Sequence, residues 1–176
     1  MAEHSIPVLF SEEEIRDRID DLAHRIAKAM TGDLMIVALL RGSFMFTADL
    51  IRALYRVGVH PQIDFMTLTS YDGIHSTKEV TINRDITEDV RDKQVLVVDD
   101  ILETGRTLRY AIDVLKERGA KDIKTCMLLE KPGKRDVVAH ADFVGFTVPD
   151  KFVVGYGLDY DNHYRELPYI GYLDIH

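Results

Sequence analysis

Three carboxylates and a glycine-containing turn stand close together in the segment VLVVDDILETGRTL, residues 95–108. Asp99 and Asp100 directly follow four apolar residues, and Glu103 comes just before the turn. The turn consists of Thr104, Gly105, Arg106 and Thr107. Glycine permits a tight turn, and successive backbone N–H groups at the start of a helix form a concave anion site. The hydroxyl and guanidinium groups add donors, so the turn is best suited to a terminal phosphate.

The acidic pair needs a different partner, because Asp99 and Asp100 would repel that phosphate. Carboxylates accept hydrogen bonds from vicinal hydroxyls, and their hard oxygens suit Mg²⁺. A phosphate, a diol and a magnesium ion together describe a sugar phosphate that carries a further polyphosphate. Taken alone, such a turn is more often a simple helix cap, and such a pair a solvated strand edge. Their combination between a buried strand and a helix favours a binding site.

Other phosphate-binding classes fit less well. The sequence contains neither the GxxxxGK[ST] motif of a P-loop nor the GxGxxG motif of a dinucleotide fold. A response-regulator receiver domain also has an acidic pair after a strand. In that class the pair normally follows the first strand, and the TGRT turn is missing.

Length and charge indicate an ordinary globular protein. The chain has 176 residues and a formal net charge of −8 at pH 7. This length suits one buried core, so we expect a single domain over residues 1–176. The acidic balance argues against a broad nucleic-acid-binding face, which needs a basic surface, although a local basic cluster can still bind an anion.

The expected compartment is the cytoplasm. The longest apolar run, Leu34–Leu40, is too short to span a bilayer, so we expect no membrane partner. The first ten residues lack the basic and apolar regions of a secretory signal. Cys126 is the single cysteine and lies in an apolar, strand-like run. A buried thiol without a disulfide partner is typical of a reducing compartment.

Strands and helices alternate along the chain. Ser11 and Glu14 form a capping-box pattern before a helix from residue 12 to about residue 31. Ser43 is positioned to cap a second helix that ends near Gly58, and a third helix leads to Gly119. The expected strands cover residues 33–40, 62–71, 79–83, 94–98, 122–129, 142–148 and 152–160. This order predicts an α/β fold with a mainly parallel twisted sheet flanked by helices on both faces. Ligands should then bind in the loops after the strands.

The segment 95–108 resembles the phosphoribosyl-pyrophosphate-binding motif of the type I phosphoribosyltransferases. The resemblance covers almost the whole chain, and DFVGFTVPDKFVVGYGLDYDNHYRELPYIGYL resembles the purine-binding segment of the branch that uses hypoxanthine and guanine. It implies a small purine-binding hood formed by the C-terminal segment. It also implies a Mg²⁺-dependent salvage enzyme that transfers the phosphoribosyl group to a purine and releases pyrophosphate.

The resemblance also assigns the donor site. It implies that Asp99 and Asp100 lie by the ribose hydroxyls and the metal, with Asp159 as a further metal ligand. The 5-phosphate-binding residues would be Thr104, Gly105, Arg106 and Thr107. Pyrophosphate would be bound by Arg41, Gly42 and Arg165, often with a non-proline cis peptide before residue 41. The family usually has lysine at position 41, and arginine keeps its charge.

The purine site is assigned in the same way. The resemblance implies that Lys131 donates to the exocyclic oxygen, that Phe152 stacks on the ring, and that Lys151 and Val153 flank it. Ser70 and Tyr71 would begin a mobile loop that closes over the reaction. From the residues alone, the polar segment 72–78 is an ordinary hairpin connection and Phe152 a core residue.

Glu103 matches the carboxylate that manages the proton on the second imidazole nitrogen of the purine. The family usually has aspartate there, and the extra methylene requires either a shifted loop or a different proton-transfer geometry. Some alternatives stay open: a same-fold regulator that senses nucleotides and binds RNA, which the charge of −8 disfavours, and an enzyme that also accepts xanthine. The family forms dimers or tetramers, and we expect a homodimer or a homotetramer.

Overall fold

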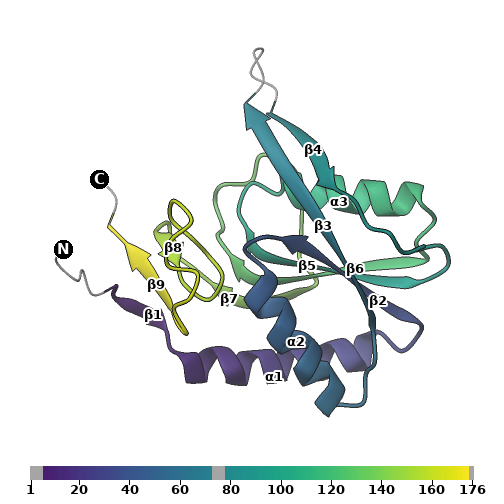
Figure 1. Ribbon diagram of the computed structural model, residues 1–176, viewed down its shortest axis with the longest axis horizontal. Helices are drawn as coiled ribbons and strands as arrows, with labels where there is room; N and C mark the ends of the chain where they lie inside the picture. The colour runs from purple at the N-terminus through teal and green to yellow at the C-terminus, as the bar shows by residue number, and fades with distance from the viewer. Residues whose placement is uncertain (1–5, 73–77, 175–176) are drawn as a thin grey trace.

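A mainly parallel sheet forms the centre of the computed structural model, which describes residues 6–72 and 78–174 (Figure 1). Among these residues the sheet has six strands in the order β4-β3-β2-β5-β6-β7. The strands are β2 (Leu34–Leu40), β3 (Gln62–Asp72), β4 (Lys78–Arg84), β5 (Gln94–Leu102), β6 (Asp122–Glu130) and β7 (Phe143–Thr147). β4 pairs antiparallel with β3, and the other neighbours pair in parallel. The predicted fold class is confirmed.

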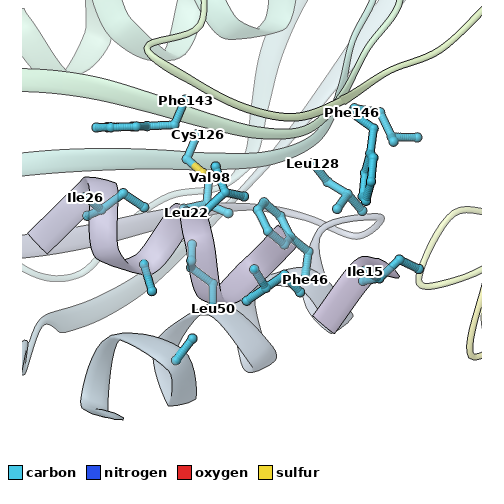
Figure 2. Close-up of a cluster of buried hydrophobic side chains, with 14 of the residues drawn as sticks. Ile15, Leu22, Ile26, Phe46, Leu50, Val98, Cys126, Leu128, Phe143 and Phe146 are labelled. Atoms are coloured by element: carbon cyan, nitrogen blue, oxygen red, sulfur yellow. The ribbon is translucent and has the colours of Figure 1, made fainter. Parts of the chain in front are cut away.

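Helices cover both faces of this sheet. They are α1 (Glu12–Ala29), α2 (Phe44–Arg56) and α3 (Arg106–Glu117). α1 and α2 contribute Leu22 and Phe46 to a core on one face, together with side chains of the sheet (Figure 2). α3 contributes Leu108 to a second core on the other face. β2 lies between the two cores, which explains its unbroken apolar run. No helix of the described ranges is long and apolar enough to cross a membrane.

The two predicted helix caps differ in their chemistry. Ser11 and Glu14 form the predicted capping box: Glu14 N donates to Ser11 Oγ at 3.1 Å, and Ser11 N donates to Glu14 Oε2 at 2.8 Å. Ser43 occupies the N-cap position of α2 but makes no side-chain cap bond. Its hydroxyl instead donates to the carbonyl oxygen of Leu39 at 2.5 Å. The predicted capping role of Ser43 is therefore wrong, because its side chain fastens the end of β2 to the following loop.

A second, small sheet brings together the two ends of the described chain. It consists of β1 (Val8–Phe10), β9 (Ile170–Leu173) and β8 (Phe152–Val154), paired antiparallel in that order. We call this sheet and the connecting residues 155–169 the hood, which lies at one end of the main sheet (Figure 1). β1 and β9 were not predicted. The strand predicted over residues 152–160 was too long, because the chain turns at Gly155, Tyr156 and Gly157, which have φ values of 96°, 52° and 98°.

β5 is longer than its apolar run predicted. It continues past residue 98 to Leu102 and keeps its parallel pairing with β6, where Asp99 pairs with Met127 and Leu102 with Glu130. The acidic pair therefore lies on the strand itself rather than in the loop after it. Because their backbone is paired with β6, the positions of the two carboxylates are fixed relative to the sheet.

Asp64 is a buried carboxylate of β3 that holds the segment after β4. It accepts backbone hydrogen bonds from Phe65 at 2.7 Å, Thr87 at 2.6 Å and Glu88 at 2.9 Å. Burial acts to raise the pKa of Asp64, but the hydrogen bonds outweigh it, and the pKa lies below the ordinary value of 3.8. The ionised form of this side chain is therefore part of the folded structure.

We expect Asp64→Asn to lower the free energy of unfolding at neutral pH by about 1–3 kcal/mol, because the amide brings a donor to buried N–H groups. A carboxyl group whose pKa is lowered by folding stabilises above its unfolded value of 3.8, and this contribution is lost as the pH falls through the folded-state pKa. The variant and the wild type should therefore converge in acid. Urea denaturation across the pH range measures both effects. The exposed Asp17→Asn control should change stability by about 0.5 kcal/mol or less at every pH, and an equal loss in both variants would contradict the role of Asp64.

Candidate active site

Two cavities adjoin at the carboxyl end of β5. The first, which we call the turn cavity, has a volume of about 300 Å³ and is lined by residues 39–42, Leu68, residues 99–105, Thr107 and Leu108. The second, the hood cavity, has a volume of about 680 Å³. Its lining consists of Asp100, Ile101, Glu103, Lys131, Lys134, residues 150–153 and residues 158–160. Asp100, Ile101 and Glu103 line both cavities, so a ligand can reach from one to the other.

The predicted phosphate turn forms one wall of the turn cavity. Thr104, Gly105 and Thr107 line it, and α3 begins there with its unpaired amide groups. Gly105 has a φ of 83°, and a side chain on it would press against Ala139. The guanidinium of Arg106 turns elsewhere: Nε donates to Asp136 Oδ2 at 2.8 Å. The structure thus brings three of the four predicted residues to the cavity and directs the side chain of Arg106 to Asp136.

The loop after β2 forms another wall. Its Leu40–Arg41 peptide bond is cis, as the resemblance implied. Gly42 lies so close to Asp100 that a Cβ atom on the glycine would overlap Oδ2 of the carboxylate. A Cβ atom on Gly157 of the hood would in turn clash with the carbonyl oxygen of Gly42. The loop therefore packs between the acidic pair and the hood, and no residue larger than glycine fits at positions 42 and 157 without a shift of these neighbours.

Asp99 and Asp100 are crowded at the exit of β5. Burial raises the pKa of Asp99 well above its ordinary value, and the charge of Asp100 adds to this effect. Burial raises the pKa of Asp100 as well. Asp99 Oδ1 accepts from Asp100 N at 2.8 Å, and Asp100 Oδ1 accepts from Ile101 N at 2.7 Å. Two neighbouring carboxylates with raised pKa values are ionised more easily when a cation or hydroxyl donors approach, so the pair fits the predicted magnesium ion and diol.

A magnesium ion beside Asp99 and Asp100 would take some of its ligands from the protein and the others from the substrate and water. In the ranges 6–72 and 78–174, no group of three or more His, Cys, Asp or Glu side chains could hold a metal ion. Asp159 lies in the hood, where Oδ1 is 3.1 Å from Arg165 Nη2 and Oδ2 accepts from Asn162 N at 2.7 Å. Mg²⁺ commonly uses one or two carboxylates and completes its shell with phosphate oxygens and water. Asp99 and Asp100 can supply those one or two carboxylate ligands.

The four predicted purine-binding residues all line the hood cavity: Lys131, Lys151, Phe152 and Val153. Lys131 follows β6 and is only 6% exposed. Phe152 is 43% exposed, and its ring meets Tyr160 edge-on with 5.4 Å between the ring centres. The ammonium of Lys151 lies 3.6 Å from the centre of the Tyr172 ring. A buried donor and an accessible aromatic face beside one cavity suit a flat heterocycle that carries an oxygen.

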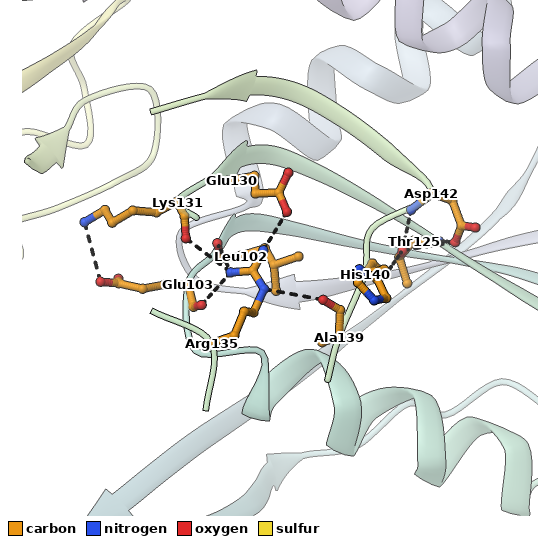
Figure 3. A network of polar contacts seen from close by, with 9 residues as sticks. All are labelled: Leu102, Glu103, Thr125, Glu130, Lys131, Arg135, Ala139, His140 and Asp142. Carbon is orange, nitrogen blue, oxygen red and sulfur yellow. Dashed lines mark hydrogen bonds and ion pairs between the residues drawn. The ribbon is translucent and has the colours of Figure 1, made fainter. Parts of the chain in front are cut away.

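Glu103 stands where the two cavities meet. Its Oε1 lies 3.5 Å from Lys131 Nζ and 3.7 Å from Lys134 Nζ. Figure 3 draws the pair with Lys131 as a dashed line. Lys134 makes a closer ion pair with Asp150, at 2.6 Å, and this contact raises the pKa of Lys134. The side chain of Glu103 is 35% exposed. A carboxylate at this junction can therefore accept a proton from a ligand in the hood cavity.

Arg165 binds the hood turn through three groups. Nη1 donates to the carbonyl oxygen of Gly157 at 2.7 Å, Nε donates to Asn162 Oδ1 at 3.3 Å, and Nη2 pairs with Asp159. Its charge also lowers the pKa of Asp100, against the larger, raising effect of burial. Arg165 therefore holds the turn that lies against Gly42, at the edge of the turn cavity.

Ser70 and Tyr71 lie on β3, where they pair with Val80 and Glu79 of β4. These two residues therefore belong to the paired strands, and the predicted loop begins only after Asp72, the last residue of β3. Its residues 73–77 lie outside the described part of the chain.

The sequence analysis missed three residues of this region. Lys134 and Tyr160 line the hood cavity, and Arg135 donates to the backbone carbonyls of Glu103 and Lys131 from behind it (Figure 3). A signal was present, because KPGKRD, residues 131–136, is a charged Pro-Gly turn directly after a buried strand. Such a turn is ordinarily solvated, and its contacts with the end of β5 are not visible in the sequence.

Comparisons with known proteins agree with this geometry. The sequence model of the phosphoribosyl transferase domain matches residues 9–161. Hypoxanthine phosphoribosyltransferase of Escherichia coli K12 is 46% identical over 172 residues, which cover 96% of this chain and 95% of that protein. A crystal structure of a hypoxanthine phosphoribosyltransferase from Staphylococcus aureus has a TM-score of 0.88 at 42% identity, covering 94% of this chain and 90% of that one. The Trypanosoma cruzi enzyme has a TM-score of 0.90 at 39% identity, covering 98% and 94%.

Proposed function

Because the chain belongs to the phosphoribosyl transferase family, we propose that it is a purine salvage enzyme. It transfers the 5-phosphoribosyl group of phosphoribosyl pyrophosphate to hypoxanthine or guanine and releases IMP or GMP with pyrophosphate. The observation that carries this proposal is the junction at Glu103 between a cavity built around a phosphate turn and a cavity with a buried lysine and an exposed phenylalanine.

The turn cavity is the proposed donor site. Backbone N–H groups of residues 104–107 hold the 5-phosphate, and Asp99 and Asp100 accept hydrogen bonds from the ribose hydroxyls. Arg41 and Gly42 hold the pyrophosphate, and Arg165 approaches it from the hood. A magnesium ion held by Asp99 and Asp100, with Asp159 nearby, would neutralise charge on the leaving pyrophosphate. These contacts position the donor so that most of the catalysis is orientation and charge stabilisation.

The hood cavity is the proposed acceptor site. Phe152 stacks on the purine and Lys131 donates to its exocyclic oxygen, while Lys151 and Val153 border the ring. A ring nitrogen forms a bond to the anomeric carbon as the bond from that carbon to pyrophosphate breaks. The proton on the other imidazole nitrogen passes to Glu103. The segment that begins at Ser70 and Tyr71 is the proposed lid that excludes water, which would otherwise hydrolyse the donor.

An absorbance assay with the four common purines tests the proposal. The protein, phosphoribosyl pyrophosphate and Mg²⁺ are combined with hypoxanthine, guanine, xanthine or adenine, and the nucleotide formed is followed. We expect turnover with hypoxanthine, guanine or both, little with adenine, and none after chelation of Mg²⁺. The rates also decide whether xanthine is accepted. Activity with none of the four bases would refute the proposed function.

Gly42→Ala should lower kcat/KM for phosphoribosyl pyrophosphate by about 10- to 100-fold, because the added methyl group displaces the Asp100 carboxylate from its place beside the loop. Steady-state kinetics at saturating purine measure this. Gly133→Ala is the control: a Cβ atom there meets nothing within 4 Å, so any loss in this variant comes from its backbone φ of 88° and not from a displaced side chain. If Gly42→Ala is no slower than Gly133→Ala, the contact with Asp100 has no part in donor binding.

We further propose that residues 1–176 act as one domain, in the cytoplasm, and as a homodimer or homotetramer. The shared sheet between the two cores supports the single domain. The buried, single Cys126 supports a reducing compartment. For assembly, the support is the T. cruzi relative, whose C-terminal region was studied for its role in oligomeric state. Light scattering of the purified protein distinguishes dimer from tetramer, and a monomer at micromolar concentration would refute self-assembly.

A further inference from the structure

Arg135 lies behind the proposed active site and forms hydrogen bonds with the ends of two strands. It sits in the loop between β6 and β7, and Figure 3 shows its guanidinium between the ends of β5 and β6. Nη1 donates to the carbonyl oxygens of Leu102 at 3.1 Å, Glu103 at 2.5 Å and Lys131 at 3.2 Å. Nη2 donates to Glu130 Oε1 at 2.6 Å. One side chain therefore joins the ends of two strands.

The strand ends need such a bridge because the β5–β6 pairing stops there. The last pair in register is Leu102 with Glu130. At the next position the chains part, since Glu103 leads into the phosphate turn and Lys131 into the β6–β7 loop, and one backbone bond, from Lys131 N to Leu102 O at 2.9 Å, still joins them. Arg135 donates to the carbonyl oxygens of Glu103 and Lys131, which lie beyond the last strand pair, and adds a second donor to that of Leu102. Its hydrogen bonds take the place of the next backbone pair between β5 and β6.

Arginine is suited to this place. Its guanidinium carries five donors in a rigid plane, whereas the ammonium of lysine is a point charge on a flexible stem. The carboxylate of Glu130 both orients the guanidinium and balances its charge. The side chain is 23% exposed, so most of it is enclosed by these partners.

The loop that carries Arg135 is itself fixed at two other points. The amides of Asp136 and Val137 donate to the carbonyl oxygen of Thr104 at 2.9 and 3.4 Å. At the far end, Asp142 and Thr125 exchange backbone-to-side-chain hydrogen bonds of 2.8 and 3.0 Å (Figure 3). Arg135 is thus anchored independently of any ligand.

We propose that Arg135 is a positioning residue for the reaction, a role that rests on the proposed function. By holding the backbone of Glu103 and of Lys131, it keeps their side chains, 3.5 Å apart, directed at the same purine. It acts without touching substrate, because it lines neither cavity of the site but a separate surface depression, together with Glu130, Pro132, Gly133 and residues 136–140. The proton acceptor and the oxygen-recognising lysine are therefore set by one guanidinium.

Kinetics of Arg135 variants test this role. We expect Arg135→Met to lower kcat/KM for hypoxanthine by about 100-fold, as a shift of both side chains by about 1 Å would. KM for phosphoribosyl pyrophosphate should change by about threefold at most, because the phosphate turn keeps its own anchor at Thr104. Arg135→Lys retains the charge and part of the bonding, so its loss should be about tenfold.

Arg118→Met controls for general destabilisation. Arg118 is 34% exposed and pairs with Asp85 through two hydrogen bonds of 2.6 and 2.5 Å, and neither residue lines either cavity. This control should lower Tm about as much as Arg135→Met and keep kcat/KM within about twofold of wild type. The proposal is overturned if Arg135→Met keeps wild-type kcat/KM, or if Arg118→Met is equally slow. If Arg135→Met does not fold, Arg135→Lys decides: a tenfold loss at unchanged Tm supports the proposal, and wild-type kinetics overturn it. An inactive wild type would instead overturn the proposed function, and this role with it.

Discussion

Glu103→Gln should lower the turnover number with hypoxanthine by about 10²- to 10⁴-fold, the usual contribution of a positioned general base. The amide has nearly the same shape as the carboxylate but cannot take up the purine proton. The phosphate turn and the acidic pair are untouched, so phosphoribosyl pyrophosphate should still bind with an affinity close to that of the wild type. Stopped-flow or steady-state kinetics give the turnover number, and titration calorimetry gives the donor affinity.

Two matched variants make this result specific. Glu103→Asp keeps the carboxylate and restores the residue that the family usually has, so it should retain turnover within about tenfold of the wild type. Glu117→Gln makes the same chemical change at an exposed position near the end of α3 and should have no effect. An unchanged turnover number in Glu103→Gln would remove Glu103 from the chemistry and leave it only an ion-pair partner of Lys131 and Lys134.

Lys131→Met should lower kcat/KM for hypoxanthine by about 10- to 100-fold, because a charged hydrogen bond to the purine oxygen is lost in a buried site. The preference for oxo-purines over adenine should shrink, since the methionine no longer distinguishes an oxygen from an amino group. Competition between hypoxanthine and adenine in one reaction measures that preference directly. Lys116→Met, at an exposed position of α3, is the control and should leave both values unchanged. Wild-type affinity for hypoxanthine in Lys131→Met would contradict the assignment.

The elements that carry the site could be predicted from the sequence because their signals are local. β2 and the start of β5 are unbroken apolar runs, and α1 begins with a capping box. β1 and β9 are strands of three and four residues that pair with each other from opposite ends of the chain, as Val8 pairs with Gly171. Pairing at such a separation leaves no periodic pattern in either segment. The hood sheet could therefore not be derived from local patterns.

The residues of the candidate site likewise fall into those that local sequence predicted and those that it did not. Asp99, Asp100 and the turn after Glu103 were found because they are consecutive, and each has a chemistry that its neighbours complement. Arg106 was placed with the phosphate by its charge and by the family resemblance, whereas its guanidinium pairs with Asp136 across 30 residues of sequence. Arg135 was missed for the converse reason, since its partners are backbone carbonyls up to 33 residues away. Contacts between a side chain and distant backbone have no residue-type signature.

A crystal structure of the protein with IMP tests the central claim, that the two cavities form one active site, most directly. We expect the 5-phosphate in the turn of residues 104–107 and the purine over Phe152, with its oxygen bonded to Lys131 and its imidazole edge facing Glu103. A nucleotide bound with its phosphate outside that turn, or with its base outside the hood cavity, would contradict the account.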